Sequence, residues 1–406
     1  MPHVGRIGRW MAQRLLTGRS PYLWPVSLLR RQLDLSPMPI DKPGRILGDL
    51  VGVKGFRYLA GLFETDLAAP GLGDPVAPVP DWPELDPGRV AVGPGVNRLG
   101  FARDKPAHPM RLIALRDVFF AHRGDRFCVF RGAAIDTRST AIPSQACLVD
   151  AAAGRGAQVA RMIYCGNRHS PDNPAHFLGD HLTTAALLAK AGYAPSEIFL
   201  PATGAPVNRT LQGAVNPGFR SAIPDRLYRV EELLLPTSAV VAGAGHHPFH
   251  IADPAILSEF AAAAEGVTAG VEGGGRLLYI SRAKAQRRRM VNERDLIGGL
   301  RQLGFVSVEM EDLQGPGQLA AVAAADVIIA PHGGALATLF AARPGAAVLE
   351  LFHPDRGTLA FAAVAARRGL RYEALSGAAR DLDRWVIDVE AVRAAALRLM
   401  GAGSSP

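Results

Sequence analysis

The chain contains little cysteine, which limits both its compartment and the sites that it can form. Only three cysteines occur, Cys128, Cys147 and Cys165, and they lack the short spacings of a structural zinc site. An odd number without a disulfide framework is typical of a reducing compartment, where thiols pack as small apolar side chains. Long apolar runs are also missing, because charged residues interrupt each one before the ~18 residues that a membrane span requires. We therefore expect a cytoplasmic protein, soluble or peripheral at the inner face of a membrane.

Lysine and aromatic residues are scarce as well. Lysine occurs at only five positions, so arginine supplies most of the basic charge behind the net +8. Such charge suits nucleic acid, anionic lipid or a phosphorylated substrate. Aromatic residues make up 7% of the chain, and none interrupts the basic run Arg282–Arg289 as a stacking platform would, which argues against a nucleic-acid-binding protein. A P-loop motif is absent, and no Gly-x-Gly-x-x-Gly follows a predicted strand, which argues against a dinucleotide-dependent oxidoreductase.

The most informative segment runs from Ala324 to Phe340. A β-branched strand, Val327–Ala330, ends at Pro331 and leads into the turn His332-Gly333-Gly334, after which 335–342 is predicted to be a helix. A strand, a glycine turn and a helix leave backbone N–H groups directed at the turn, where they favour an anion. Glycines there let a phosphate approach the backbone without a Cβ clash. This segment predicts a site for a phosphorylated ligand.

The preceding segment predicts the sheet around that site. Arg276–Ser281 has a buried-strand pattern, and Arg282–Met290 is a basic loop. Asn292 and Asp295 approach a capping box for a helix that ends at Gly304. Strands that alternate with helices indicate a doubly wound parallel sheet, which binds ligands at the carboxyl ends of its strands. Ser281-Arg282 and His332-Gly333 both follow such strand ends.

The amino-terminal part of the chain is organised differently. Met1–Leu33 contains no acidic residue and has the spacing of a basic amphipathic helix, which either lies on an anionic membrane surface or docks on the protein. Pro70–Pro94 is rich in proline and glycine. Short strands between Arg111 and Phe130 indicate an antiparallel meander, and 175–191 is a predicted helix. A hinge is expected at Gly243–Gly245.

Several segments together resemble glycosyltransferase family 61. The resemblance rests on Tyr279–Arg282, Val291–Glu293, the turn Ala330–Leu336, Pro344-Gly345, Val348–Glu350, the helix Asn173–Leu182 and the strand with its Pro-Thr end at Tyr228–Thr237. One departure is that Gly334-Ala335 stand in the reverse of the family's usual order. The resemblance covers roughly 110–352, most of the chain.

This resemblance implies an α/β fold of the GT-B type, with two Rossmann-like domains, a cleft between them and a loop-rich amino-terminal arm. We expect a basic helix and arm at 1–100, an acceptor-side domain at 101–242, a nucleotide-sugar-binding domain at 243–380, and a carboxy-terminal helix and tail at 381–406. The implied activity is inverting, metal-independent transfer of a hexose or pentose from a nucleotide-diphosphate donor to a glycan or lipid-linked hydroxyl, in surface polysaccharide (capsule) synthesis. No cofactor is expected, and nucleic acid is not an expected partner.

The same resemblance assigns roles to individual residues. Asp180 and His176 lie four apart, hence on one helix face, and are the candidate catalytic pair, with Asp180 favoured as the base and His176 as the alternative. The candidate donor-binding residues are Ser281, Arg282, Arg289, Asn292, His332, Gly333, Gly334, Ala335 and Glu350. Arginines 287–289 are equally consistent with a solvated loop, and Glu350 with a packing or ion-pair role. His246, His247 and His250 lack a zinc pattern, so no metal site is predicted.

Overall fold

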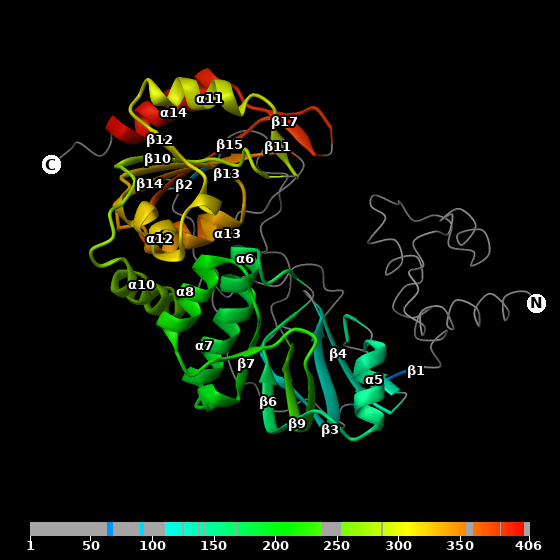
Figure 1. Ribbon diagram of the computed structural model, residues 1–406. Helices are drawn as coiled ribbons and strands as arrows, with labels where there is room; N and C mark the ends of the chain where they lie inside the picture. The colour runs from blue at the N-terminus through cyan, green and yellow to red at the C-terminus, as the bar shows by residue number, and fades with distance from the viewer. Residues whose placement is uncertain are drawn as a thin grey trace, which may run out of the picture.

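The computed structural model describes residues 63–67, 90–92 and 110–401, except for gaps at 124–125, 133, 137–138, 142, 168, 238–252, 286, 355–359 and 382. The helix expected in Met1–Leu33 and the hinge expected at Gly243–Gly245 lie outside the described residues, as do His246, His247 and His250. Within the described ranges, no helix is long and apolar enough to cross a membrane. The fold is mixed α/β and is built around two large sheets (Figure 1).

The first sheet has eight strands in the order β1-β5-β4-β3-β9-β6-β7-β8. They are β1 (Phe63–Thr65), β3 (Leu112–Arg123), β4 (Arg126–Arg131), β5 (Ala134–Asp136), β6 (Ala157–Tyr164), β7 (Ile198–Pro201), β8 (Arg220–Ala222) and β9 (Leu227–Pro236). Strand β3 pairs antiparallel with β4 and β9, which confirms the predicted antiparallel strands, whereas β6 runs parallel to β9 and β7. The rings of Phe120, Phe127 and Tyr164 pack in the core of this sheet.

The second sheet has six strands, all parallel, in the order β12-β10-β13-β14-β15-β2. They are β2 (Val90–Val92), β10 (Leu277–Ile280), β12 (Val306–Val308), β13 (Val327–Pro331), β14 (Ala347–Phe352) and β15 (Arg371–Ser376). Every residue of β13 and β14 is buried, as expected for parallel strands that are covered on both faces. The parallel sheet predicted from alternating strands and helices is therefore confirmed.

Helices cover both faces of this second sheet (Figure 1). One face packs against α10 (Pro254–Thr268), α12 (Gly315–Ala324), η7 (Gly334–Ala341) and α13 (Ala360–Arg367), and the other against α11 (Glu293–Arg301) and α14 (Val389–Gly401). A small third sheet is formed by β11 (Arg289–Met290), β17 (Arg384–Val386) and β16 (Ala378–Ala379). The helix predicted after the glycine turn is a 3₁₀ helix, η7, rather than an α-helix.

The remaining helices belong to the first half of the chain, apart from one short turn. They are α5 (Gln145–Ala152), α6 (Pro174–His176), η3 (Phe177–Leu182), α7 (Thr183–Lys190), η4 (Pro195–Glu197) and α8 (Pro206–Val215); the 3₁₀ turn η6 (Met310–Asp312) follows β12. The helix predicted over 175–191 is continuous, but its middle segment, η3, is a π-helix. Asn292 is the N-cap residue of α11, as predicted, but its side chain makes no cap hydrogen bond, so the expected approach to a capping box is wrong.

The helices between the two sheets share one hydrophobic core. Val207 and Leu211 of α8 belong to the same buried cluster as Phe260 of α10 and Leu319 of α12. The approach of α12 to α8 is close, because a Cβ on Gly315 would lie 2.2 Å from the Thr210 hydroxyl. Strands β1 and β2 both come from the first hundred residues and join different sheets. Strand β9 ends at 236 and α10 begins at 254, so the boundary expected near 242 falls outside the described residues.

Candidate active site

A cavity lies at the carboxyl ends of β10 and β13, where the second sheet meets helices of the first half. Its volume is about 480 Å³, which suits a small-molecule ligand. Five of the predicted donor-binding residues line it: Ser281, Arg282, Gly333, Gly334 and Ala335. The opposite wall is formed by Asp172 to Pro174 before and at the start of α6, and by Gly204 to Val207 at the start of α8. The structure thus brings together residues more than a hundred positions apart in the chain.

The end of β10 is held in place by a buried carboxylate that the sequence did not single out. Glu293, the first residue of α11, is 5% exposed. Its Oε1 accepts hydrogen bonds from the Tyr279 hydroxyl at 2.9 Å, the Ser281 hydroxyl at 3.2 Å and the Arg282 backbone N–H at 2.8 Å. A carboxylate at a helix amino terminus is also favoured by the helix dipole. Glu293 therefore positions the backbone from which the Arg282 side chain enters the cavity.

Arg282 is the main cation of the cavity. Its Nη1 donates to the His332 carbonyl at 2.7 Å, and its Nη2 donates to the Arg287 carbonyl at 3.4 Å. The Nε atom is buried and has no hydrogen-bond partner among the described residues. Burial, together with the like charge of Arg288, lowers the pKa of Arg282 to about 10, so the guanidinium remains charged at neutral pH. A bound anion would satisfy Nε and offset both unfavourable effects.

The structure requires a glycine at position 333 and at position 334 for two different reasons. A Cβ on Gly333 would lie 1.8 Å from Arg282 Nη1, and a Cβ on Gly334 would lie 2.5 Å from the side-chain oxygen of Asn173. Gly333 therefore leaves room for the guanidinium, and Gly334 leaves room for the start of α6. The sequence suggested that both glycines make room for a phosphate directly, whereas the space beside each is filled by protein atoms.

His332 is fixed by a buried carboxylate at the end of β14. Its Nδ1 lies 2.5 Å from Oε1 of Glu350, which is fully buried, and the Tyr372 hydroxyl donates to Oε2 at 2.5 Å. The His332 ring also stacks on Phe352, with ring centroids 5.0 Å apart. Both carboxylate oxygens of Glu350 are therefore engaged, and its position supports a role in orienting His332. Contact between Glu350 and the donor stays a prediction.

Four predicted donor-binding residues are not part of the cavity lining: His332 and Glu350, described above, and Asn292 and Arg289. The Asn292 side chain donates to the Ile387 carbonyl at 2.8 Å and accepts from the Ile387 N–H at 3.1 Å, so it ties α11 to the segment before α14. Arg289 lies on β11 with an exposed side chain. Donor contacts by these two residues stay predictions.

The wall opposite Arg282 is held together by hydrogen bonds between two loops. The Asp172 carboxylate accepts from the Gly204 N–H at 2.6 Å and from the Thr203 hydroxyl at 3.2 Å. Asn208 donates to the Pro171 carbonyl at 2.8 Å. Helix α8 begins at Pro206 without a side-chain cap, so its amino terminus presents uncapped N–H groups beside the cavity. This arrangement favours an anionic group between α8 and Arg282.

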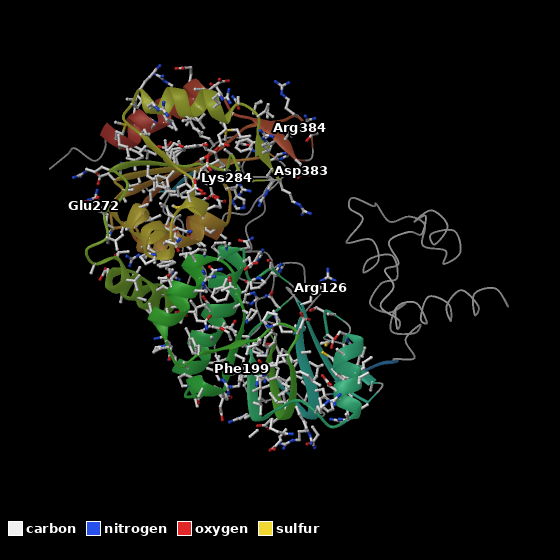
Figure 2. The ribbon with its side chains drawn as sticks, viewed as in Figure 1. Arg126, Phe199, Glu272, Lys284, Asp383 and Arg384 are labelled. Atoms are coloured by element: carbon white, nitrogen blue, oxygen red, sulfur yellow. The ribbon has the colours of Figure 1, made fainter. Side chains whose placement is uncertain are left out.

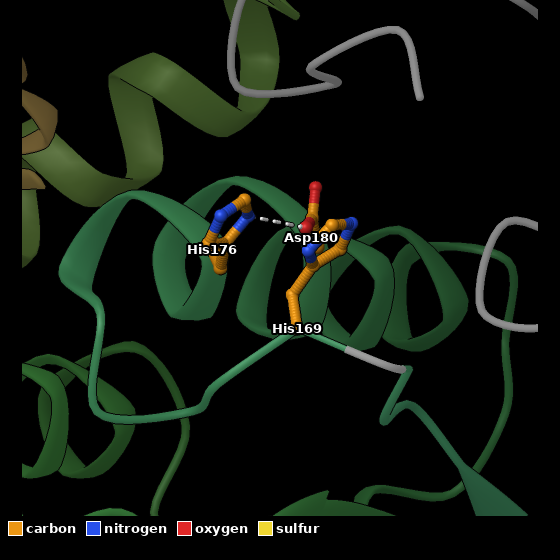
Figure 3. Close-up of side chains that lie close together, drawn as sticks. All are labelled: His169, His176 and Asp180. Carbon is orange, nitrogen blue, oxygen red and sulfur yellow. Dashed lines mark hydrogen bonds and ion pairs between the residues drawn. The ribbon is translucent and has the colours of Figure 1, made fainter. Parts of the chain in front are cut away.

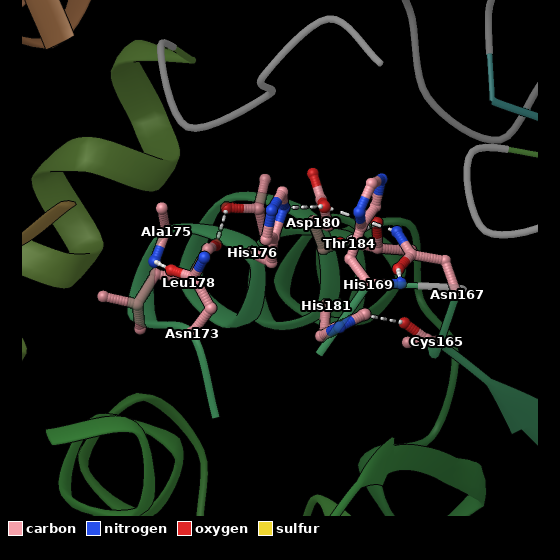
Figure 4. A network of polar contacts seen from close by, with 11 residues as sticks. Cys165, Asn167, His169, Asn173, Ala175, His176, Leu178, Asp180, His181 and Thr184 are labelled. Atoms are coloured by element: carbon pink, nitrogen blue, oxygen red, sulfur yellow. Dashed lines mark hydrogen bonds and ion pairs between the residues drawn. The ribbon is translucent and has the colours of Figure 1, made fainter. Parts of the chain in front are cut away.

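The candidate catalytic pair is assembled by the helix that begins at this wall. His176 Nδ1 lies 3.1 Å from Asp180 Oδ2, which also accepts from Asn167 Nδ2 at 3.3 Å (Figure 4). The His176 side chain is 27% exposed and that of Asp180 only 8%. Burial by itself would raise the pKa of Asp180, but the hydrogen bond from His176 and the nearby histidines hold it below its usual value. Asp180 is therefore ionised at neutral pH.

A second histidine, which sequence reasoning missed, completes this group. The rings of His169 and His176 are stacked with centroids 4.1 Å apart and an angle of 6° between their planes (Figure 3). Asn167, also missed, accepts from the His169 backbone N–H at 2.8 Å while it donates to Asp180. His169 precedes the helix in a loop, so no helical spacing connects it with His176 in the sequence.

The π-helix explains how the pair is presented. The Thr183 hydroxyl donates to the Leu178 carbonyl at 2.7 Å, five residues back, and the Thr184 hydroxyl donates to the Asp180 carbonyl at 2.6 Å. These bonds hold the wider turn, a type that is frequent at functional sites. His181, which follows Asp180, points to the interior and donates through Nδ1 to the Cys165 carbonyl at 3.0 Å.

The same group contains potential metal ligands. One ligand atom each from His169, His176 and Asp180 lie within 4.8 Å of one another. Two ligands of a zinc ion at ~2.1 Å lie at most ~4.2 Å apart, so binding would need only a small contraction. The expected independence from metal therefore stays a prediction that chelation can test.

The fold thus combines a cavity that contains the Arg282 guanidinium with a carboxylate–histidine pair, Asp180 and His176, on the helix that begins at the cavity wall. Residues 175–349 match the family model described as Glycosyltransferase 61. The match begins in α6, ends in β14, and includes His176, Asp180 and Arg282. The chain therefore contains a glycosyltransferase family 61 domain over this range, and the resemblance seen in the sequence motifs is confirmed there. No curated protein matches the chain.

Proposed function

We propose that this glycosyltransferase is an inverting enzyme that moves a sugar from a nucleoside-diphosphate donor to a hydroxyl of a glycan or lipid-linked acceptor, in cytoplasmic synthesis of surface polysaccharide. The observation that carries the proposal is the partly buried Arg282 guanidinium, whose buried Nε has no hydrogen-bond partner among the described residues, in a cavity at the strand ends. A cation that is penalised by burial and by a neighbouring cation gains most from a polyanion such as a diphosphate.

The donor half of the reaction uses the positive groups of the cavity. The leaving diphosphate would accept hydrogen bonds from Arg282 and from the uncapped amino terminus of α8, and Arg288 on the cavity wall would add a second charge. These groups are preorganised, because Glu293 and Gly333 fix the position of Arg282. Preorganised charge stabilises the leaving group without a metal ion.

The acceptor half of the reaction uses the carboxylate–histidine pair. The sequence favoured Asp180 as the base, but this carboxylate is nearly buried, already accepts two hydrogen bonds and has a lowered pKa, which makes it a weak base. His176 is more exposed, and Asp180 holds its Nδ1–H, so Nε2 carries the free lone pair. His176 therefore takes the acceptor proton, and Asp180 stabilises the imidazolium that results.

A single displacement follows from this arrangement. The acceptor oxygen forms its bond to the anomeric carbon as the bond to the diphosphate breaks, and the diphosphate leaves as an anion beside Arg282. Because one displacement occurs, the anomeric configuration is inverted. A GT-B arrangement is supported by the two sheets and by the cavity between the second sheet and the helices of the first half.

The test combines nucleotide binding with donor hydrolysis. Thermal shifts with UDP, GDP, CDP, CMP and NAD should show stabilisation by one diphosphate, about 2.7 kcal/mol at 100 times its dissociation constant, with and without EDTA. Arg282→Ala should weaken that binding about ten- to a hundredfold. His176→Ala should bind normally but release nucleotide from the matching sugar donor ~10²–10⁴-fold more slowly.

A control variant and three possible results test the proposal against its alternatives. Asp150→Asn, on α5, breaks only a surface ion pair with Arg155 and should behave as the wild type. Stabilisation by NAD alone would contradict a nucleotide-sugar donor. Loss of turnover in Asp180→Asn with normal turnover in His176→Ala would return the base to Asp180. Activity that disappears with EDTA and returns with a divalent ion would assign a metal to His169, His176 and Asp180.

A further inference from the structure

A group of arginines lies on the small third sheet and in the loop that leads to it from the cavity. This outer basic strip consists of Arg287, Arg288, Arg289, Arg380 and Arg384. In the parallel register of β11 and β17, Arg289 is the direct neighbour of Arg384, and the Arg380 N–H donates to the Arg384 carbonyl at 2.8 Å. Figure 2 shows Arg384 and Asp383 at the outer edge of the second half of the molecule.

Three of the five arginines in the strip lack an acidic partner among the described residues. Other basic groups near the cavity have acidic partners: Lys284 pairs with Glu309 and Asp312, and Arg384 itself pairs with Asp381. By contrast, Arg287, Arg289 and Arg380 are exposed, and none has a carboxylate within ion-pair distance among the described residues. The acidic residues within the described parts of 287–291 and 378–386 are Asp381 and Asp383.

The backbone under these arginines is held rigidly. Arg288 adopts a left-handed conformation with φ of 55°, and its carbonyl accepts a hydrogen bond from the indole N–H of Trp385 at 2.9 Å. The Val291 N–H donates to the Trp385 carbonyl at 2.8 Å. A non-glycine residue in this conformation is uncommon and is maintained by its surroundings. The backbone of the strip near Arg288 is thus held in a defined conformation by hydrogen bonds.

The strip is continuous with the donor cavity. Arg288 lines the cavity, and the Arg287 carbonyl accepts from Nη2 of Arg282 inside it. Positive charge therefore extends from the site of the diphosphate to the outer surface. The donor accounts for the inner charges, but the exposed side chains of Arg287, Arg289 and Arg380 lie outside the cavity lining, and Arg287 and Arg380 are not lining residues of the cavity.

We propose that the outer basic strip binds the acceptor and that this acceptor is an anionic glycan, with carboxylates or phosphates along its chain. This proposal rests on the glycosyltransferase function proposed above. Planar guanidinium groups suit both kinds of anion, since each can be gripped by two hydrogen bonds. Nucleic acid is disfavoured because Trp385 is 2% exposed and offers no stacking surface. A membrane is disfavoured because Val291 is the one large apolar side chain exposed on these described segments.

The test compares two triple variants that remove equal charge. One triple variant combines Arg287→Gln, Arg289→Gln and Arg380→Gln. It should bind an oligogalacturonate about ten- to a hundredfold more weakly than the wild type. Binding of a poly(glycerol phosphate) should weaken to a similar extent if the strip also binds phosphate groups. The matched control carries Arg229→Gln, Arg294→Gln and Arg301→Gln, three exposed arginines on β9 and α11 without an ion-pair partner among the described residues. The control should bind as the wild type does, and neutral maltoheptaose should not bind.

The outcomes separate this inference from the proposed function. Nucleoside-diphosphate binding should be unchanged in the double variant Arg287→Gln and Arg380→Gln, because these two side chains lie outside the cavity lining and Arg289, a candidate donor-binding residue, stays in place. Equal glycan binding by both triple variants, or no binding of either polyanion by the wild type, would overturn the acceptor assignment while leaving the donor site intact. Sedimentation with phosphatidylglycerol vesicles that depends on the strip, without glycan binding, would replace the glycan by a membrane surface. Failure of the proposed function would appear instead as absent nucleotide binding in every variant.

Discussion

At the scale of single residues, the proposed donor site depends on the close approach of Arg282 to Gly333. The guanidinium occupies the space that a side chain at 333 would need, and Nη1 reaches the His332 carbonyl at 2.7 Å. Gly333 has an extended backbone, which any residue can adopt, so a larger residue would displace the flexible arginine rather than distort the turn. Position 333 must therefore be a glycine because the Arg282 guanidinium fills the space beside it.

Gly333→Ala should therefore lower donor affinity while leaving the stability of the fold nearly unchanged. We expect donor affinity to fall about tenfold or more, since Arg282 loses its position and a charged hydrogen bond. The melting temperature should change little. The control is Gly213→Ala in α8, where a Cβ meets nothing within 4 Å and should stabilise the helix by up to ~1 kcal/mol. Nucleotide titration and thermal melting of both variants check this prediction; unchanged affinity in Gly333→Ala would contradict it.

At the scale of elements, the first residue of α11 organises the end of β10. Glu293 accepts three hydrogen bonds through one oxygen, from Tyr279, Ser281 and Arg282. The end of β10 and the start of α11 are therefore held together as a single unit, and both determine the shape of the cavity. The π-helix has a comparable role on the opposite wall, where it presents His176 and Asp180 together.

Glu293→Ala should be strongly destabilising. Several donors around the β10 end would lose their acceptor, and each buried unsatisfied donor costs ~1–3 kcal/mol, so we expect a loss of about 2–4 kcal/mol in the free energy of unfolding. Asp295→Ala is the matched control, because it removes an exposed acid from the first turn of the same helix and should cost ~0.5 kcal/mol or less. Denaturant unfolding measures both, and equal losses would show that Glu293 is not the acceptor that holds the strand.

At the scale of the whole molecule, the buried core of the first half contains a titratable group that limits stability in acid. His181 is fully buried, and its Nδ1 donates to the Cys165 carbonyl. Burial lowers the pKa of His181 below its usual ~6.5, against the opposing attraction of Asp180.

As pH falls, the unfolded chain therefore takes up a proton at His181 at a higher pH than the folded protein does. Stability should be fully present above about pH 6.5 and should fall as pH drops towards the folded pKa, with a slope of up to ~1.4 kcal/mol per pH unit. His181→Asn retains a donor for Cys165 but cannot take up the proton, so its stability should depend less on pH in this window. Denaturant unfolding between pH 5 and 8 compares the two. Parallel pH profiles would contradict the prediction. The lowered pKa of Asp180 acts only below about pH 4.

The sequence predicted those parts of the site that depend on local pattern. Buried strands, glycine turns and helices repeat at short range, so the parallel sheet and the placement of Arg282 and His332 at strand ends could be anticipated. His176 and Asp180 could be paired because four residues bring side chains to one helix face. The family motifs lie in these same segments.

Only the tertiary structure could decide which distant groups meet. His169 stacks on His176 from a loop, Glu293 reaches back to Tyr279, and Asn173 fills the space at Gly334, none of which follows from a helical or strand period. The roles of Asn292 and Glu350 were likewise open, since their partners Ile387 and Tyr372 are distant in sequence. Local periodicity determines elements because backbone hydrogen bonds repeat, whereas side-chain partners are determined by how the elements pack.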